Sequence, residues 1–308
     1  MSQVYIGVDI GGTTVKMGRF SKDGALAEKW EIATNKENEG ENVLPDIAAS
    51  IKEHVAACYG ELLGVGVGVP GPIAEDGTVL KCANLGWGVF SVKEKVQKLL
   101  GIENVQIGND ANVASLGEMW KGGGRGYDSI VMVTLGTGVG GGIILGGKIL
   151  TGFKGAAGEI GHIKVNPNET DVCGCGGTGC LEQYASATGV VRLATKNMKE
   201  NSSLFGKEHL SAKMVFDAAK EGDGFALEVV EKFGEYLGTA LSNVSCVVDT
   251  EAIVIGGGVS RAGKIILDVV SKWYNEKSMF ALKNKDFHLA ELGNDAGIYG
   301  CVKMVIDK

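Results

Sequence analysis

The feature that most constrains this chain is an internal repetition built around glycine. Residues 4–20 read VYIGVDIGGTTVKMGRF and residues 130–145 read IVMVTLGTGVGGGIIL, so each stretch joins two β-rich runs through a turn of glycine and threonine. A second pair, residues 62–77 and 251–263, consists of apolar strands that end in glycine turns. The chain therefore contains one strand pattern twice, which predicts two α/β domains of related topology.

Helical patterns lie between these strands. Residues 44–60 carry apolar side chains at helical spacing and end in Gly60, and residues 91–101 and 223–248 are also amphipathic. We expect a small N-terminal lobe at 1–108 and a large lobe at 109–293, with a helix at 294–308 packing back on the first lobe. One large doubly wound sheet is the alternative that the pattern leaves open.

Charge and composition exclude several classes of protein. The formal net charge of −7 argues against a nucleic-acid surface, and no run of 18 apolar residues predicts a membrane span. The first residues lack the basic and apolar segments of a signal peptide. The seven cysteines are odd in number and four of them stand alone, which favours a reduced, cytoplasmic protein.

The two glycine-threonine turns are candidate phosphate sites. They fit neither the P-loop pattern nor a GxGxxG turn that opens a helix, because β-rich residues follow both. Successive backbone N–H groups at such a hairpin can form an anion nest, and Thr13, Thr14 and Thr137 add hydroxyl donors. Asp9 in such a site requires a cation, and we assign it to Mg²⁺, bound through water. Ordinary β-turns with Asp9 as a turn cap are the alternative, but the matching pair favours nucleotide binding.

Three stretches together resemble the ROK family of sugar kinases and sugar-responsive repressors. They are DIGGTTVK near the start, the run at 133–162, and CGCGGTGCLE at 173–182. The resemblance covers essentially the whole chain. It implies the two-domain actin-like, hexokinase-type ATPase fold, with duplicated ribonuclease-H-like domains and a cleft between the lobes, and it implies ATP as phosphoryl donor and a homodimer.

The nucleotide contacts follow from the hairpins and from this resemblance. ATP is expected at the first hairpin, at the second hairpin and at the three glycines, residues 256–258, that follow the apolar strand of the stretch 251–263. These positions are Asp9, Gly11, Gly12, Thr13, Thr14, Lys16, Gly136, Thr137, Gly138, Gly256, Gly257 and Gly258.

The crowded cysteines predict a structural zinc site. Cys173, Cys175 and Cys180 have the spacing C-x-C-x₄-C, and His162 is the nearest upstream histidine. Three thiolates and one imidazole suit tetrahedral Zn²⁺, and four protein ligands leave no open position for catalysis. A redox pair is the alternative, but the spacing is not C-x-x-C. In ROK kinases the same pattern is a structural zinc site.

The metal would also shape a sugar pocket. Binding one ion by two segments would draw Glu159 and Glu182 together, and both carboxylates could accept hydrogen bonds from sugar hydroxyls. One ring nitrogen of His162 could bind zinc while the other meets a hydroxyl. Exposed carboxylates on loops are the alternative for both glutamates.

Asp110, in GNDAN, is the candidate catalytic base, because phosphoryl transfer to an alcohol needs a proton acceptor. From the residues alone, a helix cap is an equal alternative. The resemblance implies the base, with Asn109 beside it on the sugar. Gly71 and Asn84 are further sugar-pocket positions, and Trp87 fits a core or the pocket.

Three classes of function compete. The first is an ATP- and Mg²⁺-dependent hexose kinase, with glucose as the expected substrate and N-acetylglucosamine, N-acetylmannosamine or fructose as alternatives. The second is a sugar-responsive repressor, which would need a helix-turn-helix domain before the first hairpin, where only eight residues precede Asp9. The third is a non-catalytic actin-like scaffold, which would need neither the zinc-linked carboxylates nor Asp110.

Overall fold

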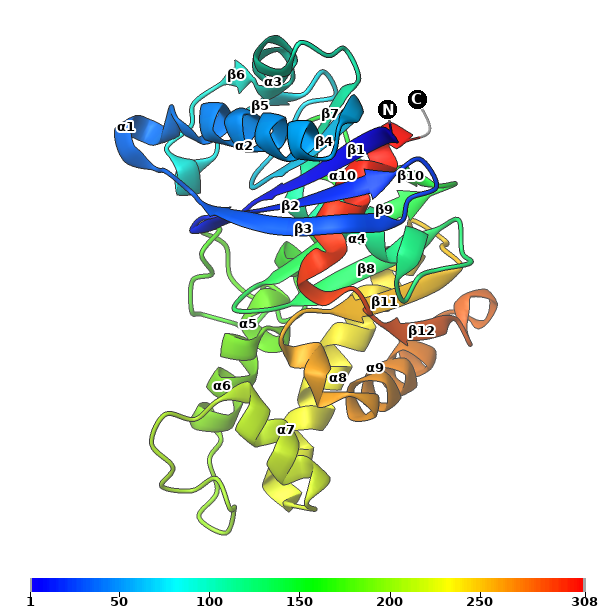
Figure 1. The fold of residues 1–308 in the computed structure, drawn as a ribbon. Coiled ribbons are helices and arrows are strands. Elements are labelled where there is room, and N and C mark those ends of the chain that lie inside the picture. Colours follow the sequence, from blue (N-terminus) through cyan, green and yellow to red (C-terminus); the bar gives the residue numbers. More distant parts are fainter. Residues whose placement is uncertain (1, 307–308) are drawn as a thin grey trace. The chain divides into compact units, whose positions relative to one another are not determined.

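The computed structural model describes residues 2–306, and its contacts divide the chain into two compact units (Figure 1). The first unit comprises Met1–Gly126, Gly142–Gly158 and Leu292–Lys308, and the second comprises Tyr127–Gly141 and Glu159–Glu291. The lobe boundary predicted between residues 108 and 109 falls inside the first unit, to which the chain returns twice more. Residues 307 and 308 of the predicted last helix lie outside the described part of the chain.

The first sheet has the strand order β3-β2-β1-β4-β7. Its first three strands are antiparallel neighbours, while β4 pairs in parallel with both β1 and β7. The strands are β1 (Ser2–Ile10), β2 (Thr14–Ser21), β3 (Leu26–Ala33), β4 (Gly60–Val69) and β7 (Val105–Asn109). A separate two-stranded ribbon joins β5 (Thr78–Val79) and β6 (Phe90–Ser91).

The second sheet repeats this order as β10-β9-β8-β11-β12. Its strands are β8 (Ile130–Leu135), β9 (Val139–Leu145), β10 (Lys148–Ile149), β11 (Ala252–Gly256) and β12 (Asp286–Leu289). Here β9 and β10 are antiparallel, whereas β11 pairs in parallel with β8 and β12. The predicted duplication is confirmed, and the alternative of one large sheet is wrong.

Helices supply the remaining layers of each unit. The first unit contains α1 (Glu37–Gly40), α2 (Val43–Ala57), α3 (Val92–Leu100), α4 (Asp110–Lys121) and α10 (Ala296–Ile306). The second contains α5 (Glu182–Ala185), α6 (Ala187–Lys196), α7 (Ala212–Lys220), α8 (Gly224–Ser245) and α9 (Lys264–Lys277), with α8 and α9 side by side. Within residues 2–306, no helix has the length and apolar composition needed to cross a bilayer.

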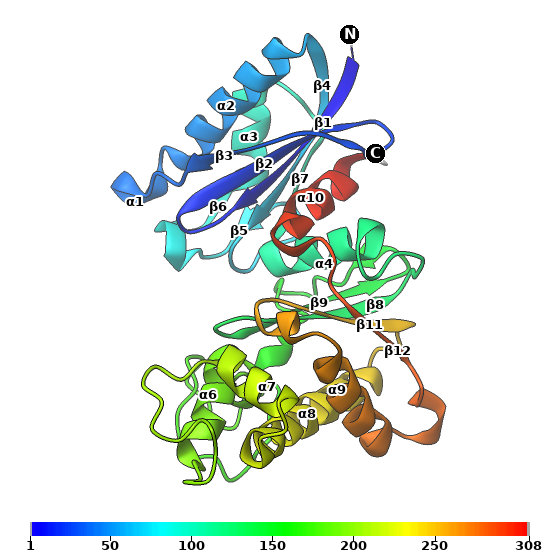
Figure 2. The same cartoon turned by 60° about the horizontal axis from the view of Figure 1, so that its bottom comes forward.

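Helix α10 packs within the first unit, against β1, β4 and α4 (Figure 2). Its apolar face, which includes Ile298 and Val302, forms a buried cluster with Tyr5 and Phe20. The helix approaches so closely that a Cβ atom on Gly66 of β4 would collide with the carbonyl group of Cys301. A Cβ on Gly300 would likewise collide with the carbonyl oxygen of Val113 in α4. The contact is therefore one of backbone against backbone, which only glycine permits.

This contact predicts a large loss of stability for Gly300→Ala. The added methyl group meets backbone atoms, which cannot move aside as a side chain can, so unfolding should become easier by about 3 kcal/mol or more. Gly224→Ala is the matched control, because nothing lies within 4 Å of the Cβ position at this first residue of α8. There alanine should be neutral or should stabilise the protein by up to about 1 kcal/mol. Urea unfolding of both variants measures the difference, and equal midpoints would contradict the packing argument.

Candidate active site and metal centre

The first hairpin is a tight turn between β1 and β2. The backbone N–H of Gly11 donates to the carbonyl of Thr14 at 3.0 Å. Thr34, the residue after β3, stabilises the turn from the neighbouring strand. Its hydroxyl donates to the carbonyl of Gly11 at 2.8 Å, and its N–H donates to the carbonyl of Thr13 at 2.9 Å. Sequence reasoning missed Thr34, because 23 positions separate it from Gly11.

Asp9 lies at the carboxyl end of β1, opposite Lys16 of β2. The pKa of Asp9 is raised to about 6: burial is the largest cause, the nearby charge of Asp110 acts in the same direction, and Lys16 opposes them. Asp9, predicted for magnesium, and Asp110, predicted for catalysis, thus interact electrostatically within the first unit. A site with two such charges is chemically suited to hold a cation.

Asp110 is the first residue of α4, at the end of β7, as the sequence indicated. Its Oδ1 accepts the backbone N–H of Ala111 and the side-chain amide of Asn109, both at 2.8 Å. The capping role belongs to Asn109, whose side chain accepts the N–H of Asn112 at 3.1 Å. Asn109 also donates to the carbonyl of Gly71 at 3.1 Å, so three predicted sugar-site residues adjoin one another.

The remaining first-unit candidates have different surroundings. Asn84 is exposed in the short 3₁₀ turn Ala83–Leu85. Trp87 is 6% exposed, and its ring N–H donates to the carbonyl of Gly40 at 3.1 Å, so it belongs to the core.

The predicted metal ligands gather in the second unit. The ligand atoms of His162, Cys173, Cys175 and Cys180 all lie within 4.8 Å of one another. The Cys173 Sγ lies 3.8 Å from Nδ1 of His162, and the Cys175 and Cys180 sulfurs are 3.6 Å apart. A tetrahedral ion with bonds of about 2.1–2.3 Å separates its ligand atoms by about 3.4–3.8 Å. The donor set and its spacing therefore fit Zn²⁺.

A lysine that sequence reasoning missed completes the charge balance of this cluster. The Nζ of Lys164 lies 3.0 Å from the Cys180 sulfur, and this contact raises the pKa of the lysine. Three thiolates around Zn²⁺ would carry an excess negative charge, which an ammonium group beside one sulfur offsets. The only signal in the sequence was that Lys164 lies two residues after the predicted ligand His162.

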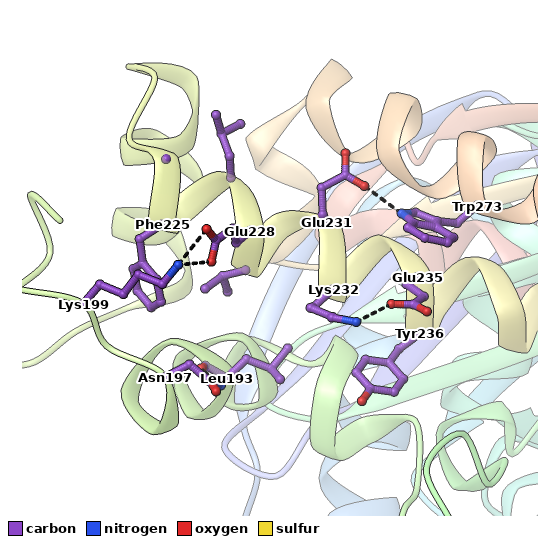
Figure 3. Close-up of a pocket in the computed structure, with 13 residues that line it drawn as sticks. Leu193, Asn197, Lys199, Phe225, Glu228, Glu231, Lys232, Glu235, Tyr236 and Trp273 are labelled. Atoms are coloured by element: carbon purple, nitrogen blue, oxygen red, sulfur yellow. Dashed lines mark hydrogen bonds and ion pairs between the residues drawn. The ribbon is translucent and has the colours of Figure 1, made fainter. Parts of the chain in front are cut away.

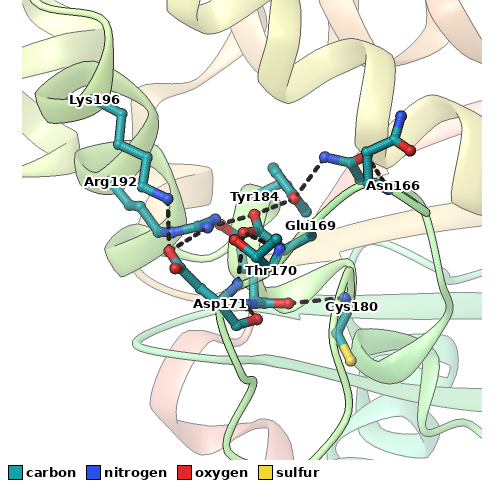
Figure 4. Close-up of polar contacts among 10 residues, drawn as sticks. Asn166, Glu169, Thr170, Asp171, Cys180, Tyr184, Arg192 and Lys196 are labelled. Atoms are coloured by element: carbon teal, nitrogen blue, oxygen red, sulfur yellow. Dashed lines mark hydrogen bonds and ion pairs between the residues drawn. The ribbon is translucent and has the colours of Figure 1, made fainter.

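The loop that leads to the cysteines rests on a polar network (Figure 4). Glu169 accepts hydrogen bonds from Arg192 and from the Tyr184 hydroxyl, which lower the pKa of Glu169 to about 2, Arg192 most strongly. Asp171 is paired with Arg192 at 2.8 Å and with Lys196 at 2.6 Å. Because Arg192 and Lys196 belong to α6, this helix holds the loop by contacts that do not involve a metal.

Glu182 connects the metal cluster to the second hairpin. Its Oε2 accepts the backbone N–H of Val139 at 3.0 Å, while its Oε1 lies 3.7 Å from the Cys173 sulfur. Glu159 is exposed at the start of the 3₁₀ turn Ile160–His162, and its carbonyl accepts the N–H of His162 at 3.1 Å. Glu182 thus adjoins the metal set through its carboxylate, and Glu159 through its backbone.

The glycines after β11 face the first strand of the same sheet. Gly257 has φ +86°, and a Cβ there would lie 2.5 Å from the backbone N of Leu135. The chain can therefore turn against the end of β8 only with glycine at this position. Gly256, the last residue of β11, and Gly258 flank this turn.

A further cavity lies elsewhere in the second unit. It encloses about 830 Å³ between α6 and α8, and its lining includes Phe225, Tyr236 and Trp273 (Figure 3). Its lysines are paired, Lys199 with Glu228 at 2.6 Å and Lys232 with Glu235 at 2.8 Å. No residue predicted for the nucleotide, the sugar or the metal lines it.

Two like sheets, each with a glycine hairpin between its first strands, and paired carboxylates at strand ends define an ATPase of the actin-like, hexokinase-type fold. A family model agrees. The model described as "ROK family" matches residues 5–308, and the chain belongs to this family.

A glucokinase of Halalkalibacterium halodurans is 43% identical over 96% of this chain and 93% of its own length. A glucokinase of Thermotoga maritima is 38% identical over 98% and 97%. The ROK glucokinase of Streptomyces griseus, solved with glucose and AMPPNP, superposes with a TM-score of 0.76 at 32% identity and covers 99% of this chain and 100% of its own.

The shifted pKa of Asp9 predicts a pH-dependent stability. Because the folded value of about 6 lies above the ordinary 3.8, folding favours the protonated form. The stabilisation is complete below pH 4 and is lost as the pH rises through 6, by at most about 3 kcal/mol. Asp9→Asn should abolish this loss, as measured by urea unfolding between pH 4 and 8 without nucleotide or Mg²⁺.

Asp23→Asn serves as the control for that experiment. Hydrogen bonds from Ser21 and from backbone groups lower the pKa of the exposed Asp23, so its replacement should not remove the loss of stability above pH 4. Parallel curves for wild type and Asp9→Asn would show that the charge of Asp9 is not the cause.

Proposed function

We propose that this protein is a glucokinase, which transfers the γ-phosphoryl group of ATP to the 6-hydroxyl of glucose. The observation that carries the proposal is the full-length similarity to a glucokinase solved with glucose and an ATP analogue. The site has the groups that this chemistry needs: anion-binding hairpins, a carboxylate for a cation and a second carboxylate at a helix start. An assay of ADP release with glucose, mannose, fructose, N-acetylglucosamine and N-acetylmannosamine tests it directly. A higher kcat/KM for an N-acetylated hexosamine or for fructose would replace glucose as the substrate.

The nucleotide half of the reaction uses both hairpins. Backbone N–H groups near Gly12 and Thr137 would donate to the phosphates, and Asp9 would hold the hydrated Mg²⁺ that accompanies ATP. When bound there, Mg²⁺ would neutralise charge that develops on the phosphate oxygens. Lys16, which lies opposite Asp9, would add a positive charge on the same strand pair.

The sugar half centres on Asp110. The 6-hydroxyl oxygen attacks the γ-phosphorus, the bond to the bridging oxygen of ADP breaks, and the hydroxyl proton passes to the Asp110 carboxylate. Asn109 holds this carboxylate through its amide at 2.8 Å, and the same amide donates to Gly71. Asn84 is assigned to the sugar with them.

The zinc site would be structural in this mechanism. With Nδ1 of His162 turned toward Cys173, the other ring nitrogen is left for a sugar hydroxyl. Glu159 and Glu182 would accept hydrogen bonds from further hydroxyls. None of the seven cysteines, which all lie within residues 2–306, forms a disulfide, and this supports a cytoplasmic location. A homodimer follows from the family resemblance as part of the same proposal.

Asp110→Asn should abolish phosphoryl transfer while largely preserving sugar binding. Loss of a general base typically lowers kcat by about 10²–10⁴-fold, whereas the amide can still hydrogen-bond the acceptor hydroxyl. Steady-state kinetics and glucose titration calorimetry measure the two effects. A kcat within about threefold of wild type would show that Asp110 is not the base.

The purified protein should contain one zinc ion per chain. Cys175→Ala removes an exposed ligand, so the core should stay folded while the glucose KM rises and kcat falls, together by about 10–100-fold. Cys246→Ala, at an exposed cysteine outside the cluster, is the control and should keep normal kinetics. Elemental analysis and glucose kinetics decide the matter, and a fully active wild type without metal would refute the structural role.

A further inference from the structure

The first residues of α6 form hydrogen bonds with the second hairpin. The carbonyl of Gly136 accepts the backbone N–H of Ala187 at 2.8 Å. The next carbonyl, of Thr137, accepts the hydroxyl of Thr188 at 2.7 Å. Two successive peptide groups at the tip of the hairpin are thus fixed by one short segment.

Those two contacts also set where the N–H groups of the hairpin point. The chain has no cis peptide bonds among its described residues, and in a planar trans peptide the C=O and the following N–H point in opposite directions. Because the carbonyls of Gly136 and Thr137 face α6, the N–H groups of Thr137 and Gly138 face away from it. These are the donors that the proposed nucleotide site requires.

Glu182 makes the third contact with the hairpin. Its Oε2 accepts the N–H of Val139, and a Cβ atom on Gly138 would collide with this same oxygen. The carboxylate therefore packs directly beneath the glycine at the hairpin tip.

The position of Glu182 depends in turn on the metal ligands. It follows Cys180 by two residues, and its Oε1 lies 3.7 Å from the Cys173 sulfur. The intervening Leu181 donates its N–H to the carbonyl of Ile163, the residue after His162, at 2.9 Å. The three cysteines that would bind zinc and the residues that hold the hairpin thus belong to one continuous stretch, residues 173–188.

We propose that residues 182–188 are a positioning segment through which the metal site sets the affinity for the nucleotide. This inference rests on the zinc site and nucleotide hairpin of the proposed function, and it extends the role of the metal from the sugar to the phosphates. Loss of the metal would let Glu182 move, and the N–H groups of Thr137 and Gly138 would lose their fixed direction.

The first experiment tests the hairpin end of this segment. Thr188→Val removes the hydroxyl contact with Thr137 and should raise the Kd for Mg–AMPPNP, measured by calorimetry without sugar, about fivefold. Thr188→Ser keeps a hydroxyl and should restore the affinity. Thr195→Val is the matched control, because this exposed residue of α6 donates a similar hydrogen bond to Val191 at 2.9 Å but does not contact the hairpin.

The second experiment tests the metal end. Removing zinc with a chelator, or by Cys175→Ala, should raise the Kd for Mg–AMPPNP about tenfold and speed the hydrogen exchange of the Val139 amide. Restoring zinc to the chelated wild type should reverse both changes. Unchanged affinity and exchange in a protein that had contained zinc would overturn the inference.

The two proposals fail separately. A wild type that lacks zinc or does not phosphorylate glucose would refute the proposed function itself. A zinc-containing, active enzyme whose Thr188→Val variant binds Mg–AMPPNP like wild type and like Thr195→Val would refute only the positioning role.

Discussion

The candidate active site depends on the close backbone contact between α10 and its neighbours in the first unit. Gly300 lets α10 approach α4 at Val113, one turn after Asp110, and a Cβ on Gly297 would lie 2.6 Å from the Asp9 carboxylate. The same helix therefore locates the residue proposed as base and the residue proposed for magnesium. Gly297 of this helix is one of the neighbours that cover Asp9, and burial is the largest cause of the raised pKa of this carboxyl.

Both hairpins use the same device to orient their backbone. Thr34 donates its hydroxyl to Gly11 in the first unit, and Thr188 donates its hydroxyl to Thr137 in the second. A threonine hydroxyl is well suited to this role because its β-branched side chain has few rotamers and holds its donor in place. The two copies differ in what supports the threonine. Thr188 follows the last cysteine of the cluster by eight residues, and Glu182 between them links the second hairpin to the predicted metal site.

Local patterns in the sequence were enough to predict the duplicated strands, the hairpins and the cysteine–histidine set, because each depends on residues that are close in the chain. The base at Asp110 needed the family resemblance, since a helix cap has the same local pattern, and only the structure shows that Asn109 is the cap. Thr188 and the buried Glu118 could not be predicted. Thr188 contacts a residue 51 positions away, and Glu118 accepts the N–H of Leu292 across 174 positions.

The packing of α10 also dictates an order of events during synthesis. Cys301 of this helix donates its thiol to the carbonyl of Val8, 293 positions earlier. The first sheet therefore cannot be covered by α10 until nearly the whole chain has been translated, which takes about 15–60 s at about 5–20 residues per second. Throughout that time the face of β1 and β4 that α10 later covers stays open to water, to other polypeptides and to chaperones at the ribosome.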